Sequence, residues 1–354
     1  MLPEELRAFV TQMGQPAYRA DQLCAWIYGK GEADINAMTN LSKQFREELQ
    51  QVAWVSQLRE VERQEARNGE AVKFLFALPT GEQIEAVLIV DGTRRTVCLS
   101  SQVGCPLDCK FCATGKMGFI ANLEAGQIVD QLLHIVRFAQ ARDERITNVV
   151  MMGMGEPLLN FDPVVRALHL MRLEEGAAIG GRKITVSTAG YVPGILKLAH
   201  EDLNVGLAIS LNATTDAQRQ EIMPINRKYK IADLLDAARQ FYELRGRRVT
   251  FEYVLLDGVT DSEEDALRLA ALTRDVPCKI NLIPYNELGP DSLFRRPSPG
   301  RLTRFRQLLE ARANVTITVR ESRGRDIDAA CGQLYQQQQV KRSRLQPQHL
   351  APVL

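Results

Sequence analysis

Residues 103–115 read VGCPLDCKFCATG and place three cysteines, Cys105, Cys109 and Cys112, at C-x3-C-x2-C spacing. Three thiolates on one short loop can hold three irons of a [4Fe–4S] cluster and leave the fourth iron open to bind a small molecule. A structural zinc site is the main alternative, but it needs four protein ligands, and the nearest further cysteine, Cys98, belongs to the preceding segment. The spacing therefore predicts a cluster that serves as a reaction centre. Plain buried thiols and a disulfide are weaker alternatives.

The composition is that of a soluble globular protein, with 45% hydrophobic and 25% charged residues in a chain of 354. This length allows one large domain, or a large domain with a small one. The start, MLPEELRAFV, has no basic region followed by an apolar run, so no signal peptide is expected, and no apolar stretch is long enough to span a bilayer. Seven cysteines without an export signal indicate a reducing cytoplasm, where thiols serve metals and chemistry.

Short apolar strands alternate with amphipathic helices from residue 94 onward. Residues 1–70 are expected to form a small helical unit, followed by a β-hairpin of VKFLF and EQIEAVLIV. The later strands are expected at VCLSS, NVVMM, KITVS, VGLAIS, VTFEYVLL, KINLI and VTITV. Strands that alternate with helices predict an α/β fold with a parallel sheet, either open or rolled into a barrel. The Gln-rich segment 336–354 is expected to be a loose, flexible tail.

Polar motifs follow these strands at their carboxyl ends, where such folds place their chemistry. GMGEP (153–157) supplies glycines that allow close approach of the backbone to a ligand and, in Glu156, a carboxylate for an ammonium group. As a bare string this motif also fits an ordinary turn. Its place one strand after the cysteine loop favours a ligand site, because S-adenosylmethionine on an open iron needs polar partners for its ammonium, ribose and adenine groups.

Several longer strings resemble one family. SSQVGCPLDCKFCATG, MMGMGEPLLN, KITVSTAG, SLNA, NLIPYNE and RGRDIDAACGQL occur in this order along the chain. The cysteine triplet with Phe111 before its last member resembles the radical S-adenosylmethionine (SAM) superfamily, and the strings together resemble the RlmN-type adenine-C2 RNA methyltransferases. The resemblance implies a partial (β/α)6 barrel over 71–335 and an RNA-contacting accessory domain over 1–70. The SAM contacts that it implies are Gly155, Glu156, Ser187, Ser210, Leu211, Asn212 and Asn286.

The resemblance also assigns roles to two further cysteines and a glutamate. Cys331 matches the methyl-carrying cysteine of the family, and Cys98 matches its partner in a transient disulfide. In the implied mechanism one SAM methylates Cys331, and a second one, cleaved at the cluster, activates that methyl group for the adenine ring, so two SAM molecules are used per turnover. Glu85 matches a proton-accepting carboxylate, although its position in IEAVLIV is also that of an outward-facing strand residue.

RNA is the expected substrate, namely 23S rRNA and tRNA, with flavodoxin or ferredoxin as electron donor and a cytoplasmic monomer as the working form. The candidate RNA contacts are the N-terminal unit and segment 295–325, which holds nine arginines and two glutamates; a solvated helix face explains these arginines equally well. Cys24 and Cys278 match no family site and are expected in the core. The alternatives are Cfr-type adenine-C8 methylation, radical chemistry on a peptide or metabolite, and a zinc or iron–sulfur RNA-binding module without catalysis.

Overall fold

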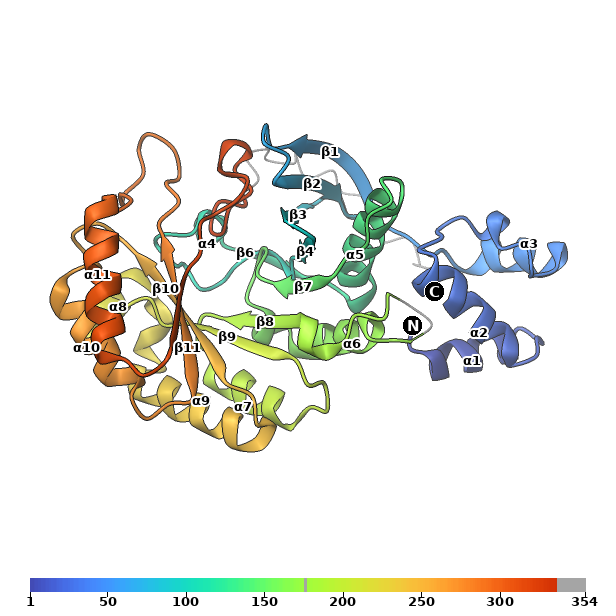
Figure 1. Ribbon diagram of the computed structural model, residues 1–354. Coiled ribbons are helices and arrows are strands. Elements are labelled where there is room, and N and C mark those ends of the chain that lie inside the picture. Colours follow the sequence, from blue (N-terminus) through green and yellow to red (C-terminus); the bar gives the residue numbers. More distant parts are fainter. Residues whose placement is uncertain (175–176, 336–354) are drawn as a thin grey trace.

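A ten-stranded mixed sheet forms the centre of the computed structural model, which describes residues 1–174 and 177–335 (Figure 1). Its first strands pair antiparallel in a meander: β1 (Arg59–Glu65), β2 (Ala71–Ala77), β3 (Gln83–Asp91) and β4 (Arg94–Cys98). The sheet continues in parallel from β4 through β7 (Asn148–Met151), β8 (Ile184–Thr188), β9 (Gly206–Ser210), β10 (Val249–Leu255), β11 (Cys278–Pro284) and β12 (Thr316–Val319). The predicted hairpin is present, and each predicted later strand overlaps an observed one.

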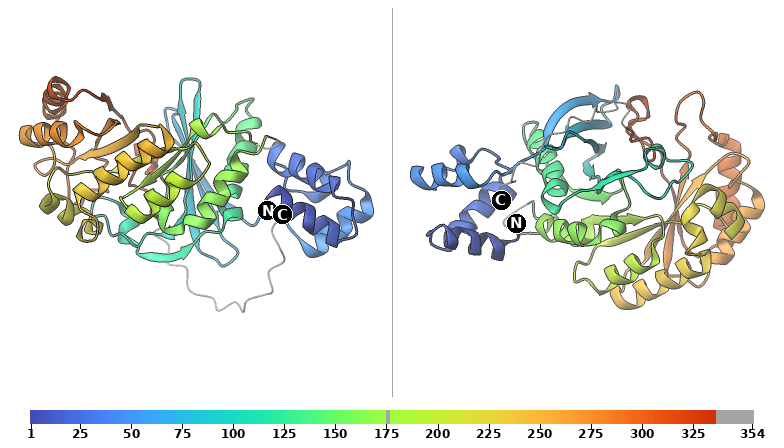
Figure 2. Two further views of the ribbon diagram at one scale, coloured as in Figure 1. Left: turned by 90° about the horizontal axis from the view of Figure 1, so that it is seen from below. Right: turned by 180° about the vertical axis from the view of Figure 1, so that it is seen from behind.

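Helices cover the outer face of the parallel strands, and the sheet curls into an open barrel (Figures 1 and 2). These helices are α5 (Ala125–Gln140), α6 (Phe161–Met171), α7 (Val192–His200), α8 (Asp216–Ile222), α9 (Ile231–Arg245), α10 (Glu263–Thr273) and α11 (Pro299–Arg312). Side chains alternate along the strands: Ile184 and Val186 of β8 are fully buried, whereas Ser187 lies on the other face and is half-buried. The partial barrel is thereby confirmed, and β12, which corresponds to the predicted strand VTITV, adds a seventh parallel strand to the six of the expected (β/α)6 barrel.

The N-terminal unit consists of α1 (Pro3–Gln12), α2 (Tyr18–Cys24) and α3 (Lys43–Val52), and it lies beside α5 and α6 (Figure 2). An ion pair between Arg166 and Glu5 joins the unit to α6. The helices end at Val52 and the sheet already begins at Arg59, so the boundary lies earlier than the residue 70 that the sequence indicated. The sequence did not predict strand β1, because REVERQE is polar apart from Val61 and has no apolar alternation.

A buried carboxylate anchors the connection between the two units. Asp130 of α5 accepts hydrogen bonds from the Ser56 hydroxyl (2.8 Å) and from the backbone N–H groups of Gln57 and Leu58 (both 3.0 Å).

No helix in the described part of the chain is long and apolar enough to cross a membrane. The predicted tail, residues 336–354, lies outside the described residues.

Candidate active site

The cysteine loop folds back on itself between two short strands, β5 (Gln102–Gly104) and β6 (Phe119–Asn122). The backbone N–H of Cys105 donates to Gly118 O (2.9 Å) and closes the loop. Gly104 has a φ of 72°, and a Cβ atom at this position would overlap Gly118 O, so only glycine fits. The triplet thus sits on a compact loop beyond the carboxyl end of β4, where the sequence placed it.

The thiols of this loop lie close enough to influence one another's ionisation. Burial raises the pKa of Cys105 to about 12 and that of Cys109 well above its usual value, and the neighbouring cysteines add to both shifts. Burial therefore disfavours the thiolate forms of Cys105 and Cys109, and a bound metal group would stabilise them by supplying positive charge and displacing the protons. Among the described residues no three ligand side chains converge on one metal ion. Three cysteines are one fewer than the four protein ligands of a structural zinc site, whereas in a [4Fe–4S] cluster each thiolate binds a separate iron, so this donor set fits the cluster.

Glu156 lies on the loop after β7 and is only 3% exposed. Its carboxylate accepts hydrogen bonds from the backbone N–H groups of Ala189 (2.7 Å) and Leu158 (3.2 Å). Burial nevertheless raises the pKa of Glu156 to about 7, because these donors only partly offset the loss of water. A carboxylate in this state is stabilised by an incoming cation, so its surroundings fit the ammonium group of an amino-acid ligand.

The glycines before Glu156 are required by packing within the protein. Gly155 has a φ of 98°, and a Cβ atom there would lie 2.5 Å from the Cβ of Gln102. A Cβ atom at Gly153 would lie 2.7 Å from the backbone of Leu99. We expected these glycines to let the backbone approach a ligand, but the space that they open is filled by the segment between β4 and the cysteine loop.

Polar side chains from β8, β9 and β11 complete the rim. Ser187 and Ser210 are half-buried near the carboxyl ends of their strands. Asn286, just after β11, donates a hydrogen bond to Cys331 O (3.1 Å), whereas its Oδ1 atom is buried with no partner in the described structure. Buried polar atoms are nearly always satisfied, so this orphaned acceptor fits a ligand that presents an N–H group, as adenine does.

Leu211 and Asn212 serve the fold with their side chains. Leu211 is fully buried in the core. Asn212 takes a left-handed φ of 56°, and its Oδ1 atom accepts a hydrogen bond from Val254 N (2.9 Å). Both side chains of these expected SAM contacts are therefore engaged within the protein.

Arg219 of α8 is a buried residue of the rim that sequence reasoning missed. Its guanidinium group is fully buried and donates hydrogen bonds to the carbonyl oxygens of Ala189 (2.6 Å), Ser210 (3.1 Å) and Leu211 (3.0 Å). It therefore fixes the ends of β8 and β9 relative to each other. The polar string DAQRQEI is typical of a solvent-exposed helix, so nothing in the sequence marked this arginine.

Two cysteines that are distant in sequence, Cys98 and Cys331, lie close enough for Cys331 to influence the pKa of Cys98. Cys98 ends β4 and is buried; burial raises its pKa to about 12, and Cys331 adds to the rise. Cys331 is accessible to solvent, yet its thiol lies among surrounding protein that raises its pKa to about 11, with Cys112 a further contributor. Cys331 therefore neighbours both Cys98 and the cysteine triplet. Cys24 and Cys278 are buried in the core, as predicted.

The segment that carries Cys331 is fastened to the helix that follows the triplet, α4 (Ala113–Lys116). The Ala113 N–H donates to Gly332 O (2.7 Å), and the Thr114 hydroxyl donates to Leu334 O (2.7 Å). These bonds fix the position of Cys331 against the cysteine loop.

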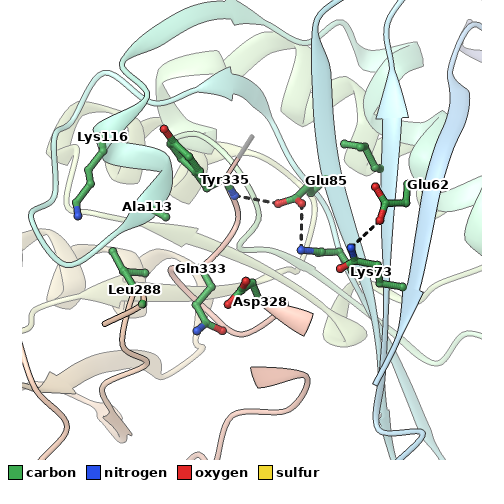
Figure 3. Close-up of a pocket in the computed structure, with 12 residues that line it drawn as sticks. Glu62, Lys73, Glu85, Ala113, Lys116, Leu288, Asp328, Gln333 and Tyr335 are labelled. Atoms are coloured by element: carbon green, nitrogen blue, oxygen red, sulfur yellow. Dashed lines mark hydrogen bonds and ion pairs between the residues drawn. The ribbon is translucent and has the colours of Figure 1, made fainter. Parts of the chain in front are cut away.

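Glu85 of β3 faces a cavity of about 600 Å³ between the meander and the Cys331 segment (Figure 3). It is 3% exposed, so the alternative of an outward-facing strand residue is wrong. Its carboxylate lies 3.3 Å from Lys73 Nζ and accepts a hydrogen bond from the Tyr335 N–H (2.9 Å). Burial raises the pKa of Glu85, although Lys73 opposes the rise. In the sequence, Lys73 stands out only as the one charged residue of the apolar strand AVKFLFA.

Most arginines of segment 295–325 are paired with carboxylates. Arg301 pairs with Asp261 (2.7 Å) and Arg304 with Glu263 (2.8 Å), which joins α11 to α10 and its preceding loop. The other paired members among the described residues are Arg295, Arg296, Arg306 and Arg323. This arrangement favours the ion-paired surface over a free basic patch for phosphates.

Comparison with known families agrees with this geometry. Residues 99–270 match the family model of the Radical SAM superfamily. Residues 1–55 match that of the ribosomal RNA large subunit methyltransferase N-terminal domain. The two matches fall on the barrel and on the N-terminal helices.

Named relatives cover nearly the whole chain. The dual-specificity RNA methyltransferase RlmN of Anaeromyxobacter dehalogenans is 46% identical over 339 residues, which are 94% of this chain and 90% of the relative. The probable enzyme of the same name from Desulforamulus reducens is 43% identical, over 95% of either chain. A crystal structure of a radical SAM methyltransferase from Sphaerobacter thermophilus has a TM-score of 0.92 and 46% identity, over 94% of this chain and 97% of that one. The chain therefore belongs to the RlmN family of radical SAM RNA methyltransferases.

Proposed function

We propose that this enzyme forms 2-methyladenosine in 23S rRNA and tRNA, with Cys331 as the methyl carrier and Cys98 as the thiol that releases the product. The observation that carries the proposal is the position of the Cys331 segment, which is hydrogen-bonded to α4 directly after Cys112, while Cys331 also adds to the raised pKa of Cys98. Adenine C2 is electron-poor and does not attack a sulfonium methyl group by ordinary displacement. A methyl group held on a protein thiol beside a radical-forming centre meets this difficulty.

The superfamily works with a [4Fe–4S] cluster and SAM. We assign Cys105, Cys109 and Cys112 as the cluster ligands, because all three lie on one compact loop and burial raises the pKa of Cys105 and Cys109, so that a positively charged metal group would stabilise their thiolates. When bound, the reduced cluster supplies cleavage of SAM to a 5′-deoxyadenosyl radical, and two SAM molecules serve each turnover. The proposed SAM contacts are Glu156, Ser187, Ser210 and Asn286, with Gly155, Leu211 and Asn212 contributing through the backbone.

The side chains of the rim divide the remaining steps among them. The Cys331 thiol loses its proton as its sulfur accepts a methyl group, and that carbon, after losing a hydrogen atom, bonds to the adenine ring. The adduct returns one electron to the electron carrier, and Glu85 accepts the proton that leaves the ring carbon. The Cys98 sulfur then attacks the Cys331 sulfur, so that a disulfide forms as the carbon–sulfur bond to the product breaks, and the product carbon takes up the proton that the Cys98 thiol loses. Solvent access to Cys331 supports this assignment, because the disulfide must be reduced before the next cycle.

We further propose a cytoplasmic monomer that receives electrons from a flavodoxin or a ferredoxin. The family membership and the small net charge of +1 support recognition of RNA through its shape and through local contacts. The N-terminal helices are the proposed RNA-contacting unit, since most arginines of segment 295–325 are already paired.

Product identity is the decisive measurement. RNA methylated by the enzyme is digested, and 2-methyladenosine and 8-methyladenosine are separated by chromatography and identified by mass spectrometry. The 2-methyl product is expected, and the 8-methyl product would overturn the assignment of C2. A modification map of both RNA pools from cells lacking the protein then shows whether rRNA, tRNA or both are substrates.

Cys98→Ala tests the release step. The variant is expected to accumulate a covalent protein–RNA adduct, because no thiolate attacks Cys331. Cys278→Ala is the matched control, since Cys278 is also buried but lies at the start of β11. Normal turnover by Cys98→Ala contradicts the role of Cys98.

A further inference from the structure

Lys73 and Glu85 form a buried ion pair on one face of the meander. The register pairs Leu75 of β2 with Glu85 of β3 and Lys73 with Val87, so the two charged side chains point to the same side of the sheet. Lys73 Nζ lies 3.3 Å from Glu85 Oε1, and the side chains are 12% and 4% exposed. Figure 3 shows both side chains meeting at the cavity, with Tyr335 on the opposite side of the carboxylate.

This pair differs from the other lysine–carboxylate pairs of the described residues. Lys43–Glu47 and Lys110–Asp108 are both largely exposed. Exposed pairs contribute little, whereas a buried carboxylate depends strongly on its partner, because water no longer screens or solvates the charge.

Glu85 is held in place by four groups from different parts of the chain. Lys73 Nζ and the Tyr335 N–H each bind one carboxylate oxygen. The Ser100 hydroxyl donates to Glu85 O (2.6 Å), and the Glu85 N–H contacts Met154 Sδ (3.4 Å). The backbone position is therefore fixed independently of Lys73, and the charge of the carboxylate depends on Lys73.

We propose that Lys73 is a positioning residue of the methyl transfer: its ammonium group keeps Glu85 charged and aims it into the cavity. The inference rests on the proposed function, in which Glu85 accepts the proton from the adenine ring. A carboxyl group that already carries a proton accepts none, and burial alone favours the protonated form. Lys73 opposes this effect of burial at Glu85 Oε1, because the other carboxylate oxygen already accepts the hydrogen bond from the Tyr335 N–H.

Other charges around the cavity determine what the test must compare. Burial raises the pKa of Glu85; Lys73 is the largest opposing influence, followed by the Tyr335 N–H, and Asp328 acts in the same direction as burial. The remaining charged residues that line the cavity are Glu62 of β1 and Lys116 of α4. Removing the charge of Lys73 and removing the charge of Asp328 should therefore shift the pH profile of activity in opposite directions.

The experiment is the pH dependence of single-turnover methyl transfer to RNA by the reconstituted enzyme, between about pH 6 and pH 9. An opposite charge at this distance lowers a carboxyl pKa by about 1–3 units, so in Lys73→Met the acidic limb is expected to move up by at least about one pH unit. Lys73→Arg should restore the wild-type limb. Asp328→Asn should move it down, and asparagine tolerates the left-handed φ of 51° at this position.

Lys116→Met is the control within the same cavity, and its limb should stay in place because Lys116 lines the cavity while the ion pair of Glu85 is made with Lys73. Thermal unfolding and iron content establish that each variant is folded and loaded, and Lys73→Gln replaces Lys73→Met if the latter does not fold. An acidic limb that stays at its wild-type position without Lys73 overturns the inference. Full activity of Glu85→Gln would instead contradict the proposed role of Glu85, so the two failures are distinguishable.

Discussion

Replacing Glu156 by glutamine tests whether the chain holds a buried carboxylate ready for a cation. Burial raises the pKa of Glu156 from 4.5 to about 7. Between these pH values the folded protein keeps a proton that the unfolded chain has lost, so the stabilising effect of the protonated group is present below pH 4.5 and disappears as the pH rises through 7. At about 1.4 kcal/mol per pH unit, this interval corresponds to about 3 kcal/mol of unfolding free energy.

The measurement is the unfolding free energy of the cluster-free protein and of Glu156→Gln by urea denaturation, between about pH 4.5 and pH 8. Glutamine does not titrate, so the variant should gain about 3 kcal/mol relative to the natural protein across this range, while all other carboxylates cancel in the difference. Glu263→Gln is a control without such a gain, because the pKa of Glu263, at the surface beside Arg304, is lowered. A difference between Glu156→Gln and the natural protein that is independent of pH would refute the reasoning.

Three further perturbations follow from the same structure. Cys331→Ala should yield no methylated RNA while iron and sulfide content stay unchanged; methylation that persists would exclude Cys331 as the carrier. Gly155→Ala should lower the unfolding free energy by about 1–3 kcal/mol, because the new Cβ would lie 2.5 Å from Gln102 at a φ of 98°; denaturation at the wild-type midpoint would show that the loop relaxes. Asp130→Ala removes the acceptor for three hydrogen bonds from residues 56–58 and should cost about 3 kcal/mol or more, with faster proteolysis of this connection; an unchanged cleavage rate would argue against the anchor.

The sequence by itself determined the cysteine loop and the architecture. Cys105, Cys109 and Cys112 are near neighbours along the chain, so their spacing alone restricts them to one loop, and Gly104 marks the turn that closes it. The parallel strands were also predictable, because runs such as KITVS and VGLAIS are too short and too apolar for anything except strands covered by helices.

Other features were decided only by the tertiary structure, because a periodic pattern shows which side of a strand is buried and not which residues lie across from it. Glu85 fits an outward position in IEAVLIV, yet it is buried because the Cys331 segment folds over the meander and brings Tyr335 to it. Lys73 pairs with Glu85 on this covered face, so its burial was likewise decided by the tertiary structure. From the sequence alone, the arginines of segment 295–325 fit a phosphate-binding patch as well as a solvated helix face. The structure places carboxylates of other elements beside them, as at Arg301 and Arg304.

The proximity of the Cys331 segment to Cys98 and Cys112 was also decided only by the tertiary structure. The resemblance named the roles of Cys98 and Cys331, but no local pattern brings β4 and the end of the barrel together. Hydrogen bonds from the Ala113 N–H and the Thr114 hydroxyl of α4 hold the Cys331 segment beside the cysteine loop, and they join groups that are far apart in sequence. The sequence therefore specified the cysteines, and the closing of the barrel brought the Cys331 segment beside the cysteine loop.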